Sequence, residues 1–318
     1  MSDIEELMRM YRVAKSYYID NLLQSEIASI ENISRSQISK ILKSAKENNI
    51  VKISIIMPGA DNQDELREGL IRKYSLIDAV IAPSDAAGDA KSAQKAFIVS
   101  CAAHLEKVLA KSRKVGIGWG NTIYDTSIQF AGINNTDEVQ LVPLITNSGS
   151  TQRSLQTTSI VDRFAEKFSR AQSIYLNQPL YRKVSEDDSD MIHNIRKMWG
   201  QLDVAIVSVG GPSADSMRDR GNVYIDELDI DREPQLEKEM FGDILAHFFL
   251  KDGSIYSAPK GYELTAVSLE QLRSIKNVMC LARGLNKVRP LAYAISEGYI
   301  KSLVTDAATA TALLEYEP

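Results

Sequence analysis

Short apolar segments alternate with helical segments along most of the chain, from about Gln63 to the C-terminus. Because parallel strands need crossover connections, which helices usually provide, the alternation predicts an α/β fold with a doubly wound, mostly parallel sheet covered on both faces. The expected strands are IDAVIAP, KVGIGWG, VQLVPLI, SIYL, DVAIVSVGG, GDILAHFF, KNVMCLA and IKSLVTD. The expected helices are 89–110, one from Asn121, 154–169, 186–199, one after Leu285, and a terminal helix at ALLEY. Such sheets bind ligands beyond the carboxyl ends of their strands, so the loops at that edge are candidate sites.

A different pattern precedes the alternation, in the stretch LLQSEIASIENISRSQISKILKSAKENNIV from Leu22 to Val51. Apolar residues repeat at helical spacing in two short segments separated by a turn, which is typical of a helix-turn-helix. The expected core residues are Ile27, Ala28, Ile33, Ile38, Ile41 and Leu42. An amphipathic helix upstream is expected to cover them with Leu7, Met10, Tyr11, Ala14, Tyr17 and Tyr18. We therefore expect a three-helix DNA-binding domain at residues 1–56 and a second domain at residues 57–318.

The turn and the second helix of this motif carry the residues expected to matter most for DNA. Asn32 stands where the turn needs a positive φ, which Asn tolerates, and Ser34 is a natural N-cap for the following helix. The outward side chains of that helix combine amide and hydroxyl groups, which can contact base edges, with cations, which can contact phosphates. They are Arg35, Ser36, Gln37, Ser39, Lys40 and Lys43. The next segment, VKISIIMPG, is expected to be an exit strand or a wing.

Charge confines any contact with nucleic acid to this motif. The whole chain has a formal net charge of −5, whereas Ser34 to Lys52 holds five basic residues and one acidic residue, a local charge of +4.

The two cysteines, Cys101 and Cys280, lie far apart in apolar context, which favours buried thiols over a disulfide. The sequence has no signal-peptide pattern and no apolar run near the ~20 residues of a membrane span, so we expect a cytoplasmic protein without membrane contact.

Three loops that follow expected strands are candidate ligand sites. GIGWGNT, from Gly116 to Thr122, can hold an anion at a helix start, although tight strand–helix packing explains its glycines equally well. TNSGSTQRS, from Thr146 to Ser154, is the best phosphate cradle in the chain because it supplies hydroxyls, N–H groups and an arginine; the alternative is a solvated polar loop. SVGGPS, from Ser208 to Ser213, is weaker because Pro212 lacks a donor.

Two charged residues lie beside these loops, and the histidines argue against metal chemistry. Asp243 enters an apolar segment, where a carboxylate usually bonds backbone donors or faces the hydroxyls of a ligand. Lys287 begins a helix and can meet an anionic group, although a lone loop lysine is more often solvated.

His104, His193 and His247 do not cluster at metal-ligand spacing, and His104 and His247 fit core positions. No metal, no cofactor and no catalytic motif is expected.

Taken in order, these residues resemble the SorC/DeoR-type family of bacterial sugar-binding transcriptional regulators. The N-terminal match comprises Gln24, Ile27, Ala28, Ile33, Ser34, Ile38 to Lys43 and Ile50 to Ile53. The C-terminal match comprises Gly118 to Thr122, Gly242 to Ile244, Phe249, Asp252, Gly253, Gly284, Lys287, Ala294, Ile295, Gly298 to Ile300 and Leu303 to Asp306. Together the two sets cover nearly all of the chain.

The resemblance implies a transcriptional regulator, not an enzyme, with an effector domain similar to ribose-5-phosphate isomerase and glucosamine-6-phosphate deaminase but without their catalysis. It implies operator DNA and a sugar or sugar-phosphate effector as partners, and a homodimer or homotetramer that regulates a carbohydrate-use operon. Carried over by position, the family's ligand-contacting aspartate is Asp243, its lysine is Lys287, and its phosphate loop is Thr146 to Arg153. The predicted DNA contacts are Gln24, Ser34, Arg35, Ser36, Gln37, Ser39, Lys40 and Lys43. The predicted effector contacts are Gly118, Asn121, Thr122, Asn147, Gly149, Ser150, Thr151, Gln152, Arg153, Asp243 and Lys287.

Two places depart from the family pattern. Thr146 and Asn147 stand where many members have two consecutive glycines, which implies a reshaped phosphate loop or a ligand without a phosphate. Leu23 replaces the threonine that usually caps the first helix of the motif, so Ser25 is expected to cap a helix that starts slightly later. The alternative function is a sugar-phosphate isomerase or deaminase with Asp243 as its base, which leaves the N-terminal motif unexplained.

Overall fold

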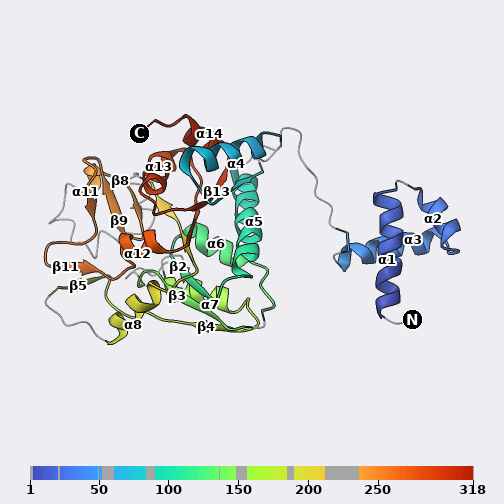
Figure 1. The fold of residues 1–318 in the computed structure, drawn as a ribbon, viewed down its shortest axis with the longest axis horizontal. Coiled ribbons are helices and arrows are strands. Elements are labelled where there is room, and N and C mark those ends of the chain that lie inside the picture. Colours follow the sequence, from blue (N-terminus) through green and yellow to red (C-terminus); the bar gives the residue numbers. More distant parts are fainter. Residues whose placement is uncertain are drawn as a thin grey trace. The chain divides into compact units, whose positions relative to one another are not determined.

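The structure is a computed structural model that describes residues 3–20, 22–48, 50–51, 61–83, 90–135, 137–147, 156–184, 190–211 and 236–317. The chain forms two compact units, Met1–Met57 and Pro58–Pro318 (Figure 1). The strand or wing expected after Val51 lies outside the described residues.

The described residues of the smaller unit form three helices, α1 (Asp3–Tyr18), α2 (Gln24–Ile30) and α3 (Arg35–Glu47), which confirms the predicted helix-turn-helix with a helix before it. Its buried core is Met10, Val13, Ala14, Ile27, Ile38, Leu42 and Ala45. Leu7 and Tyr11, predicted to cover this core, are instead 43% and 54% exposed. That prediction is wrong because the buried stripe of α1 is rotated, so that Val13 faces the other two helices and Tyr11 faces outward.

The larger unit is built on a seven-stranded sheet in the order β1-β13-β12-β6-β2-β3-β4. The strands are β1 (Asp78–Ala82), β13 (Ser302–Asp306), β12 (Asn277–Leu281), β6 (Val204–Val207), β2 (Lys114–Ile117), β3 (Val139–Pro143) and β4 (Ala171–Ser173). Every neighbouring pair is parallel. All four residues of the central strand β6 are buried, as expected of a parallel sheet covered on both faces. The predicted α/β fold is therefore confirmed.

Helices precede, connect and follow these strands along the chain, as the alternation predicts. They are α4 (Asp61–Tyr74), α5 (Ala90–Leu109), α6 (Asn121–Gln129), α7 (Thr157–Ala165), α8 (Asp190–Trp199), α12 (Leu269–Ser274), the 3-10 helix η3 (Leu285–Lys287), α13 (Val288–Ser296) and α14 (Ala307–Glu315). α5 packs on β1 and β13, whereas α7 packs on β3. Among the described residues, no helix has the length and apolar character needed to cross a membrane.

The segment GDILAHFF is not a strand of the parallel sheet, so this prediction is wrong. After α11 (Leu236–Glu239), it forms two antiparallel strands, β8 (Met240–Ile244) and β9 (His247–Leu250), in a second sheet of order β10-β9-β8-β7. Its other strands are β7 (Val209–Gly210), which follows β6 after one residue, and β10 (Ile255–Tyr256). A separate antiparallel pair comprises β5 (Tyr181–Lys183) and β11 (Tyr262–Leu264).

Both cysteines lie in the core of the larger unit, as predicted. Burial raises the pKa of the Cys101 thiol and raises the pKa of Cys280 to about 12. Because the thiolate is the reactive form of cysteine, both side chains are inert at neutral pH.

His247, at the start of β9, is a buried histidine with both ring nitrogens engaged. It is 6% exposed, with Nδ1 2.7 Å from the Ser257 hydroxyl oxygen and Nε2 2.9 Å from the Val267 carbonyl oxygen. A carbonyl can only accept, so Nε2 carries the proton and, in the neutral ring, Nδ1 accepts from Ser257. Burial lowers the pKa of this ring, because desolvation outweighs the opposing effect of the Val267 carbonyl. The predicted core role of His247 is confirmed.

We expect the free energy of unfolding to fall as the pH decreases below 6.5, the ordinary pKa of histidine. Below that pH the unfolded chain gains a proton at position 247, whereas the folded chain gains it only at its lowered pKa. The slope is at most about 1.4 kcal/mol per pH unit for each such histidine. Urea unfolding from about pH 7.5 to about pH 5.5 checks this, and His247→Gln should flatten the slope.

His104 provides a second test of the same effect, because burial lowers its pKa in the same direction. His104→Gln should therefore remove a second part of the slope. A pH dependence that is unchanged in both variants would contradict the assignment.

Candidate functional site

The turn between α2 and α3 has the geometry that the sequence predicts. Asn32 has a φ of 56°, and the N–H of Ile33 donates to the Ala28 carbonyl at 3.0 Å. Ser34 is the N-cap of α3, since its Oγ accepts from the N–H of Gln37 at 3.3 Å. The Gln37 side chain completes a capping box, because its Oε1 accepts from the N–H of Ser34 at 2.9 Å. The start of α3 is thereby fixed by two reciprocal hydrogen bonds.

The start of α2 differs from the prediction. The helix begins at Gln24, with Leu23 rather than Ser25 at the N-cap position. A leucine side chain cannot accept a hydrogen bond, but the Glu26 carboxylate accepts from the N–H of Leu23 at 2.7 Å. The missing cap is therefore compensated by a carboxylate one turn into the helix, where it also interacts favourably with the helix dipole.

One face of α3 is exposed while the other lies in the core. Ile38 and Leu42 are buried at 0% and 5% exposure. The exposed residues are Ser34, Arg35, Ser36, Gln37, Ser39, Lys40 and Lys43, and Gln24 on α2 is half-buried. Every residue predicted to contact DNA from α3 therefore lies on its outer face. This face combines three cations with hydroxyl and amide groups, which suits the phosphates and base edges of double-stranded DNA.

At the carboxyl end of β2, the two glycines of GWGNT serve packing and turn geometry. A Cβ at Gly118 would lie 2.9 Å from the Ile206 carbonyl oxygen and 3.0 Å from Leu245 Cδ2, so a side chain does not fit there. Gly120 has a φ of 119° and is the N-cap of α6. Asn121, which is exposed, and Thr122, which is half-buried, form the first turn of α6, where unpaired N–H groups can meet an anion.

The loop after β3 begins with two side chains that bond to the protein itself. Thr146 is 1% exposed, and its hydroxyl oxygen lies within 2.9 Å of the carbonyl oxygens of Leu176 and Gln178. Asn147 Oδ1 accepts from the N–H of Thr158, at the start of α7, at 3.0 Å. These two residues therefore bond to the protein itself at the positions where the resemblance implies two consecutive glycines. The remaining predicted contacts of this loop, Gly149, Ser150, Thr151, Gln152 and Arg153, lie outside the described residues.

Asp243 stabilises the turn between β8 and β9. It is 5% exposed, and its Oδ2 accepts from the N–H of Ala246 at 3.3 Å. Leu245 and Ala246 have φ values of 51° and 62°, a left-handed conformation that residues with a side chain rarely adopt. Both are almost fully buried, at 1% and 0% exposure. The carboxylate thus supports a strained turn whose Leu245 reaches the glycine at the end of β2.

Lys287, half-buried, ends η3 immediately before α13. A Cβ at Gly211 would lie 3.0 Å from Asn286 Nδ2, and a Cβ at Gly242 would lie 2.3 Å from Pro290 Cβ. These close approaches pack the segment that carries Lys287 against β7 and β8, and β8 carries Asp243. The structure therefore brings Gly118, Asp243 and Lys287 to one edge of the seven-stranded sheet, the edge at its carboxyl ends.

Two residues of this edge were missed by the sequence analysis. Leu245 forms the contact with the glycine after β2, and Asn286 lies against Gly211. The sequence held no signal for Leu245, because an apolar residue in an apolar segment suggests a strand. Asn286 directly precedes the predicted Lys287, so its position in the η3 segment was the only available signal. No group of three His, Cys, Asp or Glu residues within the described part of the chain could hold a metal ion.

Comparison with known proteins gives consistent matches along the chain. The family model described as "Putative sugar-binding domain" matches residues 60–315. The chain is 28% identical to the deoxyribonucleoside regulator of Bacillus subtilis (strain 168), over 98% of this chain and 99% of that protein. It is 25% identical to the sorbitol operon regulator of Klebsiella pneumoniae, over 99% and 100% of the two chains. It is 28% identical to the transcriptional regulator LsrR of Escherichia coli (strain K12), over 95% and 93%.

Solved structures agree with these matches. The full-length sorbitol operon regulator SorC from Klebsiella pneumoniae has a TM-score of 0.73 at 23% identity, covering 99% of this chain and 100% of that chain. A DeoR family transcriptional regulator from Listeria monocytogenes has a TM-score of 0.67 at 26% identity, covering 79% and 99%. The first similarity extends across both units and shows that the two chains share a fold.

We expect Asp243→Ala to lower the free energy of unfolding by about 1–3 kcal/mol, because it leaves the buried N–H of Ala246 without its acceptor. Asp243→Asn keeps a side-chain oxygen at the same place and should cost less than about 1 kcal/mol. Urea unfolding of the two variants measures the difference. Equal losses in both variants would show that the negative charge, and not the hydrogen bond, supports the turn.

Proposed function

The chain belongs to the SorC/DeoR family of sugar-binding transcriptional regulators, and we propose that α3 binds operator DNA under the control of a sugar or sugar phosphate held at the carboxyl edge of the sheet. The observation that carries this proposal is the exposed polar and basic face of α3. One such helix contacts only half of an operator, so the chain acts as a homodimer or homotetramer. Its target is a carbohydrate-use operon, and it acts in the cytoplasm.

The DNA-contacting residues divide by chemistry into two sets. Lys40 and Lys43 hold phosphates, which position the helix without reading sequence. Arg35, Ser36, Gln37 and Ser39 face the base edges of the major groove, where guanidinium, hydroxyl and amide groups discriminate between base pairs. Ser34, at the start of α3, and Gln24, at the start of α2, contact the sugar-phosphate backbone of the DNA.

The effector contacts also divide by chemistry. Asp243 accepts hydrogen bonds from sugar hydroxyls, and Lys287 provides a cation for a phosphate or an acceptor oxygen. Asn121 and Thr122 supply donors at the start of α6, and Asn147 supplies an amide beside α7. The loop from Gly149 to Arg153 contacts the phosphate if the effector has one. The characterised relatives are transcriptional regulators, so the isomerase alternative is not retained.

Substitutions on α3 separate base reading from phosphate contact. Arg35→Ala should cost about 1–3 kcal/mol of operator binding and relax specificity at one base position. Lys43→Ala should instead weaken binding to all sequences. It should also reduce the slope of the logarithm of the binding constant against the logarithm of salt concentration by about one, because one phosphate contact is lost. Fluorescence anisotropy with DNA from upstream of the chain's own gene, at several salt concentrations, measures both effects. Lys260→Ala, an exposed charge in the larger unit, is the control.

Gln37 needs its own pair of variants because it also caps α3. Gln37→Ala removes both the amide and the capping oxygen, whereas Gln37→Glu keeps an oxygen for the N–H of Ser34, removes the amide donor and adds a negative charge. If Gln37 reads a base, both variants should weaken operator binding by about 1–3 kcal/mol, and only Gln37→Ala should also lower the melting temperature. If Gln37→Glu binds the operator with full affinity, Gln37 does not read a base and serves only to cap α3.

Ligand binding to the folded chain should stabilise it by mass action and thereby raise its melting temperature. At a ligand concentration about one hundred times Kd, the free energy of unfolding should increase by about 2.7 kcal/mol. A panel of pentose and hexose phosphates and their free sugars is the probe. Asp243→Asn and Lys287→Gln should abolish the shift while leaving operator affinity intact. A shift that persists in both variants would place the effector elsewhere, and no shift with any compound would contradict a sugar effector.

A further inference from the structure

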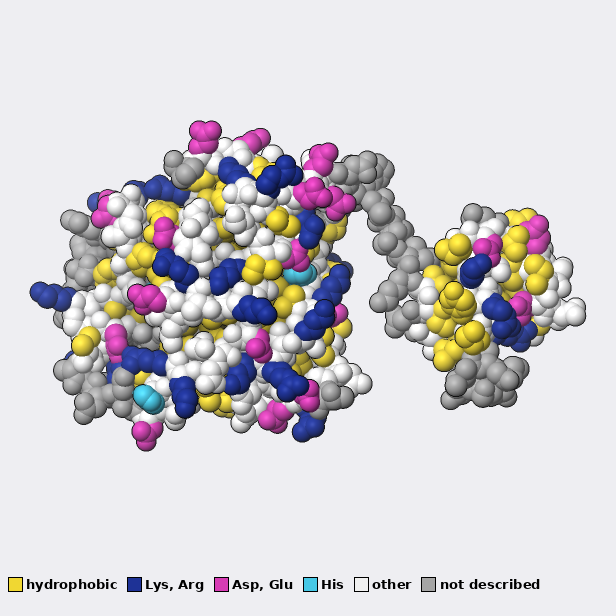
Figure 2. Space-filling view, viewed as in Figure 1, with side chains coloured by type: hydrophobic (Ala, Val, Ile, Leu, Met, Phe, Trp, Pro, Cys, Tyr) yellow, Lys and Arg dark blue, Asp and Glu magenta, His cyan; other side chains and the backbone are white. Residues whose placement is uncertain are grey.

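A cavity lies at the amino edge of the seven-stranded sheet, the edge opposite the proposed effector contacts. Its volume is about 890 Å³, and its walls include the starts of β1, β6 and β12, Arg113 directly before β2, and parts of α4 and α5. Lys and Arg side chains gather over and beside α5 on the face drawn in Figure 2. Amino and carboxyl ends of parallel strands lie at opposite edges, so this groove is separate from Asp243 and Lys287.

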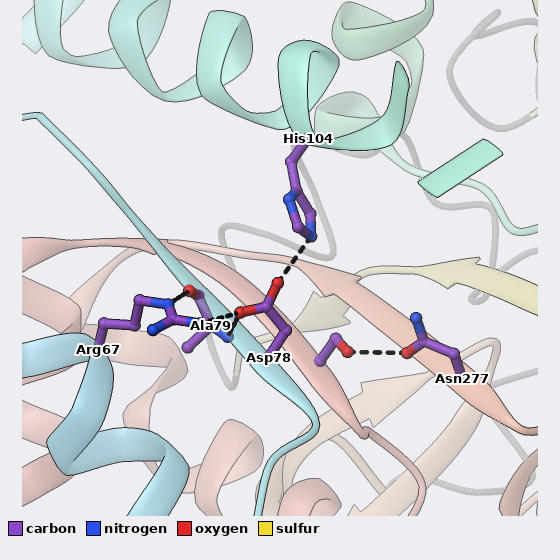
Figure 3. Close-up of polar contacts among 6 residues, drawn as sticks. Arg67, Asp78, Ala79, His104 and Asn277 are labelled. Carbon is purple, nitrogen blue, oxygen red and sulfur yellow. Dashed lines mark hydrogen bonds and ion pairs between the residues drawn. The ribbon is translucent and has the colours of Figure 1, made fainter. Parts of the chain in front are cut away.

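The two carboxylates at the strand starts of the groove already have donors from the protein. Asp78 Oδ1 accepts from Arg67 Nη2 at 2.9 Å and from the N–H of Ala79 at 2.8 Å (Figure 3). Asp203 Oδ2 accepts from the backbone N–H groups of Arg113 and Lys114 at 2.8 and 2.9 Å. Their negative charge is therefore partly compensated before any ligand binds.

Three lysines of the groove have no such compensation. The side chains of Lys107, Lys111 and Lys276 are exposed and form no hydrogen bond or ion pair with any residue that the structure describes. Lys107 and Lys111 lie at the carboxyl end of α5, whose partial negative charge they offset, but Lys276 lies before β12. Against these cations the groove adds the exposed carboxylate of Asp64. The groove thus has an excess of positive charge suited to an anion.

The remaining walls suit the rest of a ligand. Val80 and Val108, which are half-buried, give an apolar surface. Asn277 Oδ1 accepts from the Ser302 hydroxyl at 2.8 Å, which leaves the amide hydrogens of Asn277 without an acceptor among the described residues (Figure 3). His104 projects from α5 toward Asp78, with Nε2 3.8 Å from Oδ2. The volume is within the range of small-molecule sites.

We propose that this groove binds a phosphate-bearing small molecule with a flat apolar ring, of the size of a nucleotide. The phosphates contact Lys107, Lys111 and Lys276, the ring lies on the valines, and Asn277 donates to an acceptor on the ligand. The site is a second ligand site of the larger unit, and it does not depend on the identity of the effector.

Calorimetric titration of the full chain with ATP and with inorganic pyrophosphate, in metal-free buffer, tests the proposal. ATP should bind saturably and more tightly than pyrophosphate, because only ATP has a ring. Lys107→Ala and Lys276→Ala should each weaken ATP binding by roughly tenfold. Asn277→Asp, which keeps an acceptor for Ser302 but adds a negative charge, should weaken it at least as much.

Matched variants make the result decisive. Lys260→Ala removes the same charge from an exposed position outside the groove, and Lys287→Gln alters the opposite edge; both should bind ATP like the unchanged chain. Absence of saturable binding, or equal weakening by Lys260→Ala, would overturn the proposal. So would loss of binding in Lys287→Gln, or lysine variants that lower only the melting temperature or only operator affinity.

Discussion

The turn between β8 and β9 is the constraint on which the carboxyl edge of the sheet depends. Leu245 and Ala246 hold left-handed backbone conformations in the core, where they are 1% and 0% exposed. The turn persists because Asp243 accepts from Ala246 and because Gly118 leaves room for Leu245. A residue predicted as a ligand contact is thus also part of the scaffold that shapes the edge. A ligand that hydrogen-bonds to the Asp243 carboxylate therefore affects the geometry of this turn.

The parts of the fold that the sequence predicted are those set by local pattern. The central strands are apolar throughout because both faces are covered, and Asn32 and Ser34 mark a turn and a cap with residue types that few other positions favour. The β8–β9 turn could not be predicted in this way, because neither central residue is Gly or Asn. The stripe of α1 was misplaced for a related reason, since Leu7 and Tyr11 share the apolar character of its true core residues.

At two positions of the candidate sites, the structure gives a predicted contact residue a further role that its residue type did not indicate. A polar side chain near the start of a helix can contact a ligand, but it can also accept a hydrogen bond from the unpaired backbone N–H groups of that helix. Asn147 gives its oxygen to the start of α7, and Gln37 gives its oxygen to the start of α3. A sequence specifies the chemistry of a side chain but not the direction in which it points. Tertiary structure decides which of two plausible partners a polar group meets.

The capping box of α3 also bears on how a chain of this kind can acquire a new operator. Under the proposed role of α3, such change proceeds through substitutions on its outer face, and those that preserve folding are accepted first. At position 37 an oxygen that reaches the N–H of Ser34 keeps the capping box, so substitutions other than Glu lower the stability of α3. Arg35, Ser39 and Lys40 do not serve the cap. Duplicated copies of the gene would therefore diverge in DNA preference at these three positions before they diverge at position 37.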